Sequence, residues 1–88
     1  MVTDGRQAVY LLEGSLELTA APGTILSVLP IGPARGLTLT GLRWPLHGYD
    51  LLPGDTRTMS NEFTHDVAKL ALTEGVALVV VHPVDDNP

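Results

Sequence analysis

Apolar and polar residues alternate in short stretches along most of the chain. In residues 15–20 (SLELTA) and 36–40 (GLTLT), leucines occupy every second position, with polar residues at most positions between them. A period of two places successive side chains on opposite faces of a β-strand, one buried and one in water. Residues 67–73 (VAKLALT) repeat the pattern. These stretches predict half-buried strands.

Two other stretches are apolar and rich in β-branched residues. Residues 24–29 (TILSVL) indicate a strand buried on both faces, and residues 76–81 (VALVVV) indicate the central strand of a sheet. Pro30 cannot donate to a neighbouring strand, so we expect it to end the first of these strands or to lie at a sheet edge. Pairs that favour turns separate the stretches: Glu13-Gly14, Pro22-Gly23, Gly32-Pro33, Pro53-Gly54 and Glu74-Gly75.

The whole pattern predicts many short strands and no helix. The expected strands are 7–12, 15–20, 24–29, 36–40, 51–52, 56–59, 67–73 and 76–81. Ser60 would be a favourable residue at a helix N-terminus, but the residues that follow it show no helical pattern. Short strands separated by turns predict an all-β sandwich, a jelly roll or a small barrel.

Composition supports a single globular domain and excludes several functions. The chain has 88 residues, of which 44% are hydrophobic, so it can form one domain with a core of modest size. Its net charge is −5, and its five scattered basic residues do not form the cluster that nucleic acid or an anionic membrane surface requires. No apolar run approaches the roughly 20 residues of a membrane span.

Cysteine usage and the first residues bear on location. The chain has no cysteine, which excludes disulfides, a thiol nucleophile and a zinc–thiolate site. The polar first residues do not resemble a secretory signal. We therefore expect a cytoplasmic protein.

Candidate site residues gather in residues 41–62 (GLRWPLHGYDLLPGDTRTMSNE). This stretch contains the only tryptophan, Trp44, and ends in a Ser60-Asn61-Glu62 step. A lone tryptophan in a small β domain is most often core, but an indole can also stack on a planar heterocycle and attract a cationic ring. Ser60 and Asn61 fit simple turn chemistry, yet the amide of Asn61 can also read the edge of a nitrogen heterocycle.

The other polar residues do not form a catalytic or metal-binding pattern. The histidines show no metal-ligand spacing and the aspartates show no pairing: His47, His65, His82, Asp50, Asp55 and Asp66. No glycine-rich loop opens a helix, so nothing predicts an ATP site on this chain. We expect no catalytic residue, no metal site and no cofactor on the chain itself, and no phosphoryl transfer by it alone.

Four segments, in matching order and spacing, resemble the thiamine pyrophosphokinase family. Residues 25–30 (ILSVLP) are similar to its strand-Ser-strand-Pro segment, and residues 39–46 (LTGLRWPL) to its Thr-x-Gly-Leu-Lys-Trp/Tyr-Pro-Leu motif. Residues 58–62 (TMSNE) are similar to its Ser-Asn-Glu motif, and residues 75–81 (GVALVVV) to its terminal strand. The resemblance covers residues 14–82.

The resemblance implies a part in making thiamine diphosphate. Enzymes of that family transfer a diphosphate from ATP to the hydroxyl of thiamine, use Mg²⁺ and act as homodimers. An N-terminal α/β domain carries ATP and the acidic metal ligands, and a C-terminal β domain helps to bind thiamine. This sequence resembles the second domain only, so it is either an excised domain or a natural stand-alone relative.

From this resemblance we predict a jelly-roll-like β-sandwich that binds thiamine. Ser60 and Asn61 match residues of the family's thiamine site, Trp44 matches an aromatic position near thiamine, and Thr58 offers a nearby hydroxyl. The expected substrate-binding residues are therefore Trp44, Thr58, Ser60 and Asn61. The expected partners are thiamine, the N-terminal catalytic domain of the parent enzyme, and a second copy of the chain.

Two other hypotheses stay open. The chain could be a stand-alone β-sandwich that only associates with proteins, or a thiamine carrier or sensor that works without an enzyme. The feature that separates the first of these from a thiamine-binding domain is whether Trp44, Ser60 and Asn61 converge on one concave site.

Overall fold

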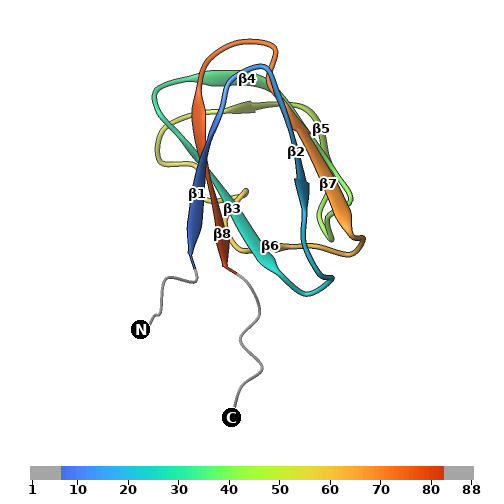
Figure 1. The fold of residues 1–88 in the computed structure, drawn as a ribbon. Helices are drawn as coiled ribbons and strands as arrows, with labels where there is room; N and C mark the ends of the chain where they lie inside the picture. The colour runs from blue at the N-terminus through green and yellow to red at the C-terminus, as the bar shows by residue number, and fades with distance from the viewer. Residues whose placement is uncertain (1–6, 83–88) are drawn as a thin grey trace.

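Two four-stranded antiparallel β-sheets face each other and make up the fold (Figure 1). A computed structural model describes residues 7–82. The strands are β1 (Ala8–Leu12), β2 (Ser15–Thr19), β3 (Ile25–Pro30), β4 (Ala34–Thr40), β5 (Leu46–Leu51), β6 (Asn61–Glu62), β7 (Val67–Ala71) and β8 (Ala77–His82). Within residues 7–82 there is no helix of the length and apolarity that crossing a membrane requires.

The order of the strands is that of a jelly roll. The first sheet runs β1-β8-β3-β6 and the second runs β2-β7-β4-β5. Only β4 and β5 are both consecutive in the chain and members of the same sheet; every other connection crosses between the sheets. Two Greek keys wrapped into a pair of sheets give this arrangement. The predicted all-β, jelly-roll-like sandwich is confirmed, and β8 is central as its β-branched sequence predicts.

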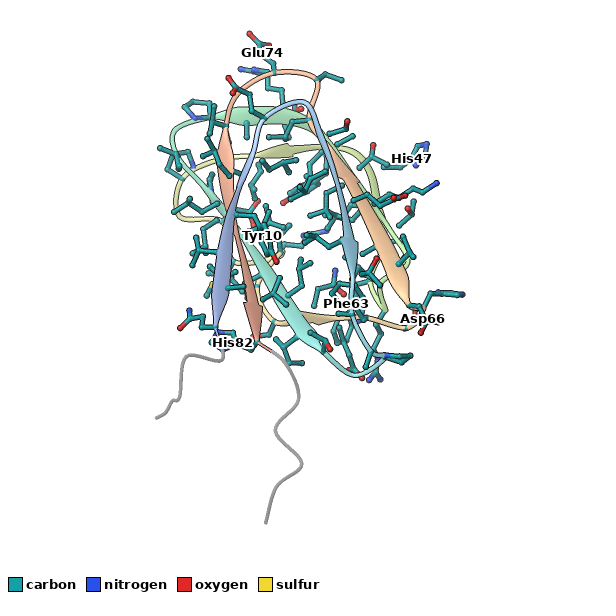
Figure 2. All side chains as sticks on the ribbon, viewed as in Figure 1. Tyr10, His47, Phe63, Asp66, Glu74 and His82 are labelled. Atoms are coloured by element: carbon teal, nitrogen blue, oxygen red, sulfur yellow. The ribbon has the colours of Figure 1, made fainter. Side chains whose placement is uncertain are left out.

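Leucine and valine side chains from both sheets fill the space between them. Alternation sets which side chains enter: in β3, Leu26 and Val28 are fully buried, while Ile25, Ser27 and Leu29 stay partly exposed. The largest fully buried side chains are Phe63, Leu12, Leu26, Leu37, Leu39, Leu51 and Leu70. Figure 2 shows this packing, with Phe63 toward the lower end of the sandwich in that view.

The outward faces of the two sheets differ in chemistry. Positions that alternate with core residues in the first sheet are mostly apolar: Val9, Leu11, Ile25, Leu29, Leu78 and Val80. The corresponding positions in the second sheet are mostly polar: Ser15, Glu17, Thr38, Thr40 and Lys69. Val9 and Leu11 are each 57% exposed. The second sheet therefore suits contact with water on its outer side, whereas the first leaves apolar surface there.

The strand predictions for residues 51–52 and 56–59 are wrong. Leu51 is the last residue of β5, and residues 57–60 form a turn, in which the Met59 N–H donates to the Thr56 carbonyl at 3.1 Å. The side chain of Asp55 accepts the Arg57 N–H at 2.9 Å. An aspartate that binds the backbone two residues later favours a turn over a strand.

Strand β5 was missed because a bulge breaks its alternation. Gly48 has a φ of +63°, and the pairing of β4 with β5 shifts register between Leu37 and Leu39. An extra residue in one strand moves the inward side chains off a period of two. Leu46, Tyr49 and Leu51 are the more buried residues of β5, a spacing that simple alternation does not predict.

Gly41 directly follows β4 and lies close to the backbone of β7. Its φ is +80°, a left-handed conformation that favours glycine. A Cβ atom at this position would overlap the Val67 carbonyl oxygen and lie 3.1 Å from the Ala68 Cα. The Gly41 carbonyl also accepts the Thr64 N–H at 3.1 Å. The close approach fixes the start of the segment that carries Trp44.

Gly41→Ala should therefore destabilise the fold far more than Gly14→Ala. Gly14 has a φ of +81°, and a Cβ atom added there would have no atom within 4 Å, so its substitution measures the cost of the left-handed backbone alone. That cost is about 1–2 kcal/mol. Gly41→Ala adds a collision with backbone atoms, and chemical denaturation should show a loss at least about 1 kcal/mol larger. Equal losses for the two variants would contradict the close approach.

Candidate functional site

A hollow of about 580 Å³ opens between the two segments that flank β5. It is lined by Arg43, Trp44, Pro45, Leu46, Arg57, Met59 and Ser60. The first four residues precede or begin β5, and the last three follow it. The volume lies within the range of pockets that hold small organic ligands.

The ring of Trp44 is exposed, while its backbone is held firmly. The residue is 53% exposed, so the only tryptophan of the chain is not part of the core. Its N–H donates to the Asn61 side-chain oxygen at 3.0 Å, and its carbonyl accepts from the Asn61 side-chain nitrogen at 2.9 Å. An exposed indole on a fixed backbone offers a flat apolar surface at low cost in conformational entropy.

The amide of Asn61 is buried beneath this segment. The residue is 3% exposed, and its side-chain oxygen also accepts the Glu62 N–H at 2.9 Å. Three hydrogen bonds thus satisfy a polar group that would be costly to bury alone. The second amide hydrogen of Asn61 makes no hydrogen bond to any other residue between 7 and 82.

Backbone pairing reinforces the junction between these two segments. Leu42 and Phe63 form a β-bridge, and the Arg43 N–H donates to the Glu62 carbonyl at 2.8 Å. The Arg43 guanidinium lies 4.9 Å from the centre of the Trp44 ring and 3.6 Å from a Glu62 carboxylate oxygen. Arg43 therefore both stacks on the indole and is partly neutralised.

Ser60 and Thr58 fix the far side of the hollow on β3. Ser60 is exposed and has a φ of 58°, the only left-handed conformation of a non-glycine residue among those described. Its N–H donates to the Ser27 hydroxyl oxygen at 2.8 Å. Thr58 is 1% exposed; its hydroxyl donates to the Val28 carbonyl at 2.7 Å, and its carbonyl accepts the Val28 N–H at 3.0 Å.

A small polar cluster fixes Arg57 at the rim. The Tyr49 hydroxyl donates to one oxygen of Asp55, and the other oxygen accepts the Arg57 N–H. The Arg57 guanidinium lies 5.4 Å from the centre of the Tyr49 ring. The hydrogen bond from Tyr49, followed by that from the Arg57 backbone, lowers the pKa of Asp55 and keeps it ionised. The hydrogen bond to Asp55 in turn raises the pKa of Tyr49, so its hydroxyl remains a donor.

The four expected binding residues thus occupy two layers. Trp44 and Ser60 line one hollow, while Asn61 and Thr58 lie behind it and hold the two segments in place. Sequence reasoning did not select Arg43, Arg57, Tyr49 or Asp55. Arg43 could have been noticed as the neighbour of Trp44, but no local pattern marks the other three.

Histidines and carboxylates do not add a metal site to this arrangement. Within residues 7–82 no three His, Cys, Asp or Glu side chains are grouped so that they could hold a metal ion. His47, His65 and His82 are all exposed and lie outside the lining of the hollow.

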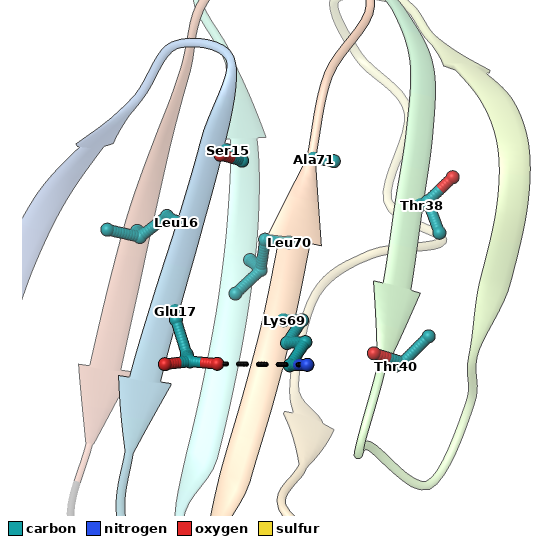
Figure 3. A pocket seen from close by; sticks show the side chains of 8 residues that line it. All are labelled: Ser15, Leu16, Glu17, Thr38, Thr40, Lys69, Leu70 and Ala71. Atoms are coloured by element: carbon teal, nitrogen blue, oxygen red, sulfur yellow. Dashed lines mark ion pairs between the residues drawn. The ribbon is translucent and has the colours of Figure 1, made fainter.

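A second hollow, of about 490 Å³, lies on the second sheet (Figure 3). It is lined by Ser15, Leu16, Glu17, Thr38, Thr40, Lys69, Leu70 and Ala71. An ion pair of 3.9 Å joins Lys69 to Glu17 on neighbouring strands. It contains none of the predicted binding residues and no aromatic side chain.

The fold and the site thus define the class of protein: a jelly-roll domain with an exposed indole beside a hollow large enough for a small ligand. The family model described as "Thiamin pyrophosphokinase, vitamin B1 binding domain" matches residues 15–77. The chain belongs to this family, and the resemblance inferred from the motifs is confirmed. Among curated proteins, a sequence search finds no significant match.

Solved structures of thiamine pyrophosphokinases share the fold. The Bacillus subtilis enzyme matches with a TM-score of 0.82 and 20% identity over 92% of this chain and 39% of its own. The Geobacillus thermodenitrificans enzyme matches with a TM-score of 0.77 and 19% identity over 91% and 39%. The Enterococcus faecalis family protein matches with a TM-score of 0.74 and 23% identity over 91% and 38%. The chain thus spans well under half the length of these proteins.

Asn61→Ala should loosen Trp44 as well as destabilise the fold. The change leaves the Trp44 N–H and carbonyl and the Glu62 N–H without their partners, which should cost about 1–3 kcal/mol. Chemical denaturation measures the loss, and fluorescence anisotropy of the lone tryptophan should show a more mobile ring. Thr40→Ala, at an exposed position of β4, serves as the control. Unchanged anisotropy in a folded Asn61→Ala protein would contradict the holding role.

Proposed function

We propose that the chain binds thiamine in the hollow beside Trp44, as the thiamine-binding part of a thiamine pyrophosphokinase. The observation that carries this proposal is the exposed indole of Trp44, whose backbone is held at both its N–H and its carbonyl by a buried amide. Membership of the vitamin B1 binding family supports the choice of ligand. The proposed substrate-binding residues are Trp44, Thr58, Ser60 and Asn61.

The chemistry of these residues matches the aminopyrimidine of thiamine. The indole of Trp44 gives a flat surface on which the ring can stack. The Ser60 hydroxyl lines the hollow and can donate to a ring nitrogen or accept from the exocyclic amine. Asn61 acts indirectly, because its buried side chain holds the backbone of Trp44. Thr58 acts indirectly, because its hydroxyl anchors the turn of residues 57–60 on β3.

In the parent reaction this chain would position thiamine and leave the chemistry to another domain. ATP and Mg²⁺ would be held by an N-terminal catalytic domain, since residues 7–82 offer no group of metal ligands. Fixing the pyrimidine aims the hydroxyethyl arm of thiamine at the ATP, and positioning of this kind converts binding into rate. We place the reaction in the cytoplasm, where ATP is abundant.

A second copy of the chain is the proposed occupant of the outward face of the first sheet. Apolar residues of β1, β3 and β8 form this face, and Val9 and Leu11 are more than half exposed. An apolar face of this extent is typical of an association surface. The β-branched stretches 24–29 and 76–81 contribute the middle of this outward face.

Thiamine should change the fluorescence of Trp44, the only tryptophan of the chain. Ser60→Ala and Ser60→Gly both remove the hydroxyl and should weaken binding about three- to tenfold. Ser60→Gly should also relieve the left-handed backbone, making it about 1 kcal/mol more stable than Ser60→Ala. Fluorescence titration and denaturation measure the two effects separately.

Loss of affinity with both variants, together with greater stability of Ser60→Gly than of Ser60→Ala, supports a ligand role for Ser60. A folded chain whose fluorescence does not respond to millimolar thiamine would overturn the proposed function and favour a domain that only associates with proteins. An equal response of wild type and both variants would remove Ser60 from the site.

Self-association should depend on the outward face of the first sheet. At concentrations on the order of 100 µM the wild-type chain should sediment as a dimer, and Leu11→Glu should sediment as a monomer, because a carboxylate is costly to bury in an apolar interface. Thr19→Glu places the same charge on the polar second sheet and should leave the dimer intact. A monomeric wild type, or equal effects of both changes, would contradict this interface.

A further inference from the structure

Two of the five basic residues of this acidic chain lie in one hollow. Arg43 and Arg57 both line the space beside Trp44, and the residues that line it include no aspartate or glutamate. Two positive charges at the hollow favour a negatively charged ligand group.

Arg57 lies near the Asp55 carboxylate but forms no direct ion pair with it. Asp55 directs its two oxygens to the Tyr49 hydroxyl and the Arg57 backbone N–H, rather than to the guanidinium. No carboxylate oxygen of residues 7–82 lies within 4.0 Å of the Arg57 guanidinium nitrogens. Stacking of the guanidinium on the Tyr49 ring leaves its N–H groups at the edge, available as donors.

Arg43 is the second, weaker cation of the pair. Its guanidinium lies 3.6 Å from a Glu62 carboxylate oxygen, and 61% of its side chain is exposed. An exposed ion pair of this kind is weak, so Arg43 can turn some of its donors toward a ligand at little cost. The two guanidinium groups flank the same hollow from the two segments that border β5.

The two guanidinium groups favour an anionic ligand group over a cationic one. Thiamine carries a positive thiazolium, and two guanidinium groups repel a third positive charge at short range. A phosphate group, in contrast, matches the planar fork of arginine and can accept two parallel hydrogen bonds from it.

We propose that Arg57, assisted by Arg43, binds a phosphate group of a ligand whose ring stacks on Trp44. The hollow then prefers thiamine phosphates, above all the diphosphate, over thiamine itself. This inference rests on the proposed function, because the ring that stacks on Trp44 is taken to be that of thiamine. The consequence for the enzyme is retention of its product, with the diphosphate competing against the next thiamine.

The test is a set of titrations of the full chain, followed by Trp44 fluorescence and by calorimetry at low and at physiological salt. The ligands are thiamine, thiamine monophosphate, thiamine diphosphate, inorganic diphosphate, and ATP without Mg²⁺. Thiamine diphosphate should bind about tenfold more tightly than thiamine at low salt, and the ratio should shrink as salt rises.

Arg57→Gln should lower that ratio about tenfold, toward one, and Arg57→Lys should give an intermediate ratio because a lysine lacks the fork. Arg35→Gln is the matched control: Arg35 is also exposed and pairs with Asp50 at 3.6 Å, away from the hollow. Circular dichroism of each variant checks that it is folded. The control should keep the wild-type ratio.

The outcomes separate the two proposals. The role of Arg57 is overturned if thiamine binds as tightly as thiamine diphosphate or more tightly. It is also overturned if Arg57→Gln leaves the ratio of the two affinities unchanged. In both cases the proposed thiamine site remains. If inorganic diphosphate or ATP binds as tightly as thiamine diphosphate and depends on Arg57 in the same way, that result overturns the stacking of thiamine on Trp44. Binding of none of these ligands overturns both.

Discussion

A single buried amide joins the two segments that make the site. Asn61 lies in the two-residue strand β6, beside Leu26 of β3, and its side chain holds the backbone of Trp44 from 17 residues away in sequence. Because Asn61 satisfies both the N–H and the carbonyl of Trp44, the exposed indole rests on a fixed base. Phe63 and Gly41 continue the junction into the core and onto β7. The placement of the Trp44 indole beside the hollow depends on this contact.

The jelly roll explains why these segments can meet. Strand β5 lies at the edge of the second sheet, and the chain must cross from there to β6 at the edge of the first. Thr58 anchors the crossing segment on β3, while the Tyr49–Asp55–Arg57 cluster ties its start back to β5. Hydrogen bonds therefore tie the crossing segment to both sheets, and a preorganised wall lowers the cost of positioning a small ligand.

Much of the fold could be predicted from the sequence because alternation and turn pairs are local signals. They located β1, β2, β3, β4, β7 and β8 with small errors at the ends. They missed β5, since the bulge at Gly48 removes its period of two, and they missed the two-residue strand β6. Residues 56–59 were mistaken for a strand, since the side-chain bond from Asp55 and the bond from Met59 to Thr56 favour a turn there. The strand order could not be predicted, because pairing between distant strands leaves no local trace.

The site could be predicted only in part, for the same reason. Trp44 and Ser60 were found through motifs, but the motifs did not reveal that Asn61 and Thr58 face inward to backbone partners 17 and 30 residues away. Arg57 and its neighbours carry no motif, and their meeting depends on the crossing segment. Contacts of high sequence separation are set by the tertiary fold, and sequence patterns alone do not show them.

The proposed function depends on contact between thiamine and the indole of Trp44. The most direct measurement is a nuclear Overhauser experiment on the isotope-labelled chain with unlabelled thiamine. The account predicts cross-peaks between the aminopyrimidine protons and the indole protons of Trp44, accompanied by peaks to Met59 at the wall of the same hollow. Cross-peaks to Ala71 and Thr38 on the second sheet instead, with none to Trp44, would contradict it.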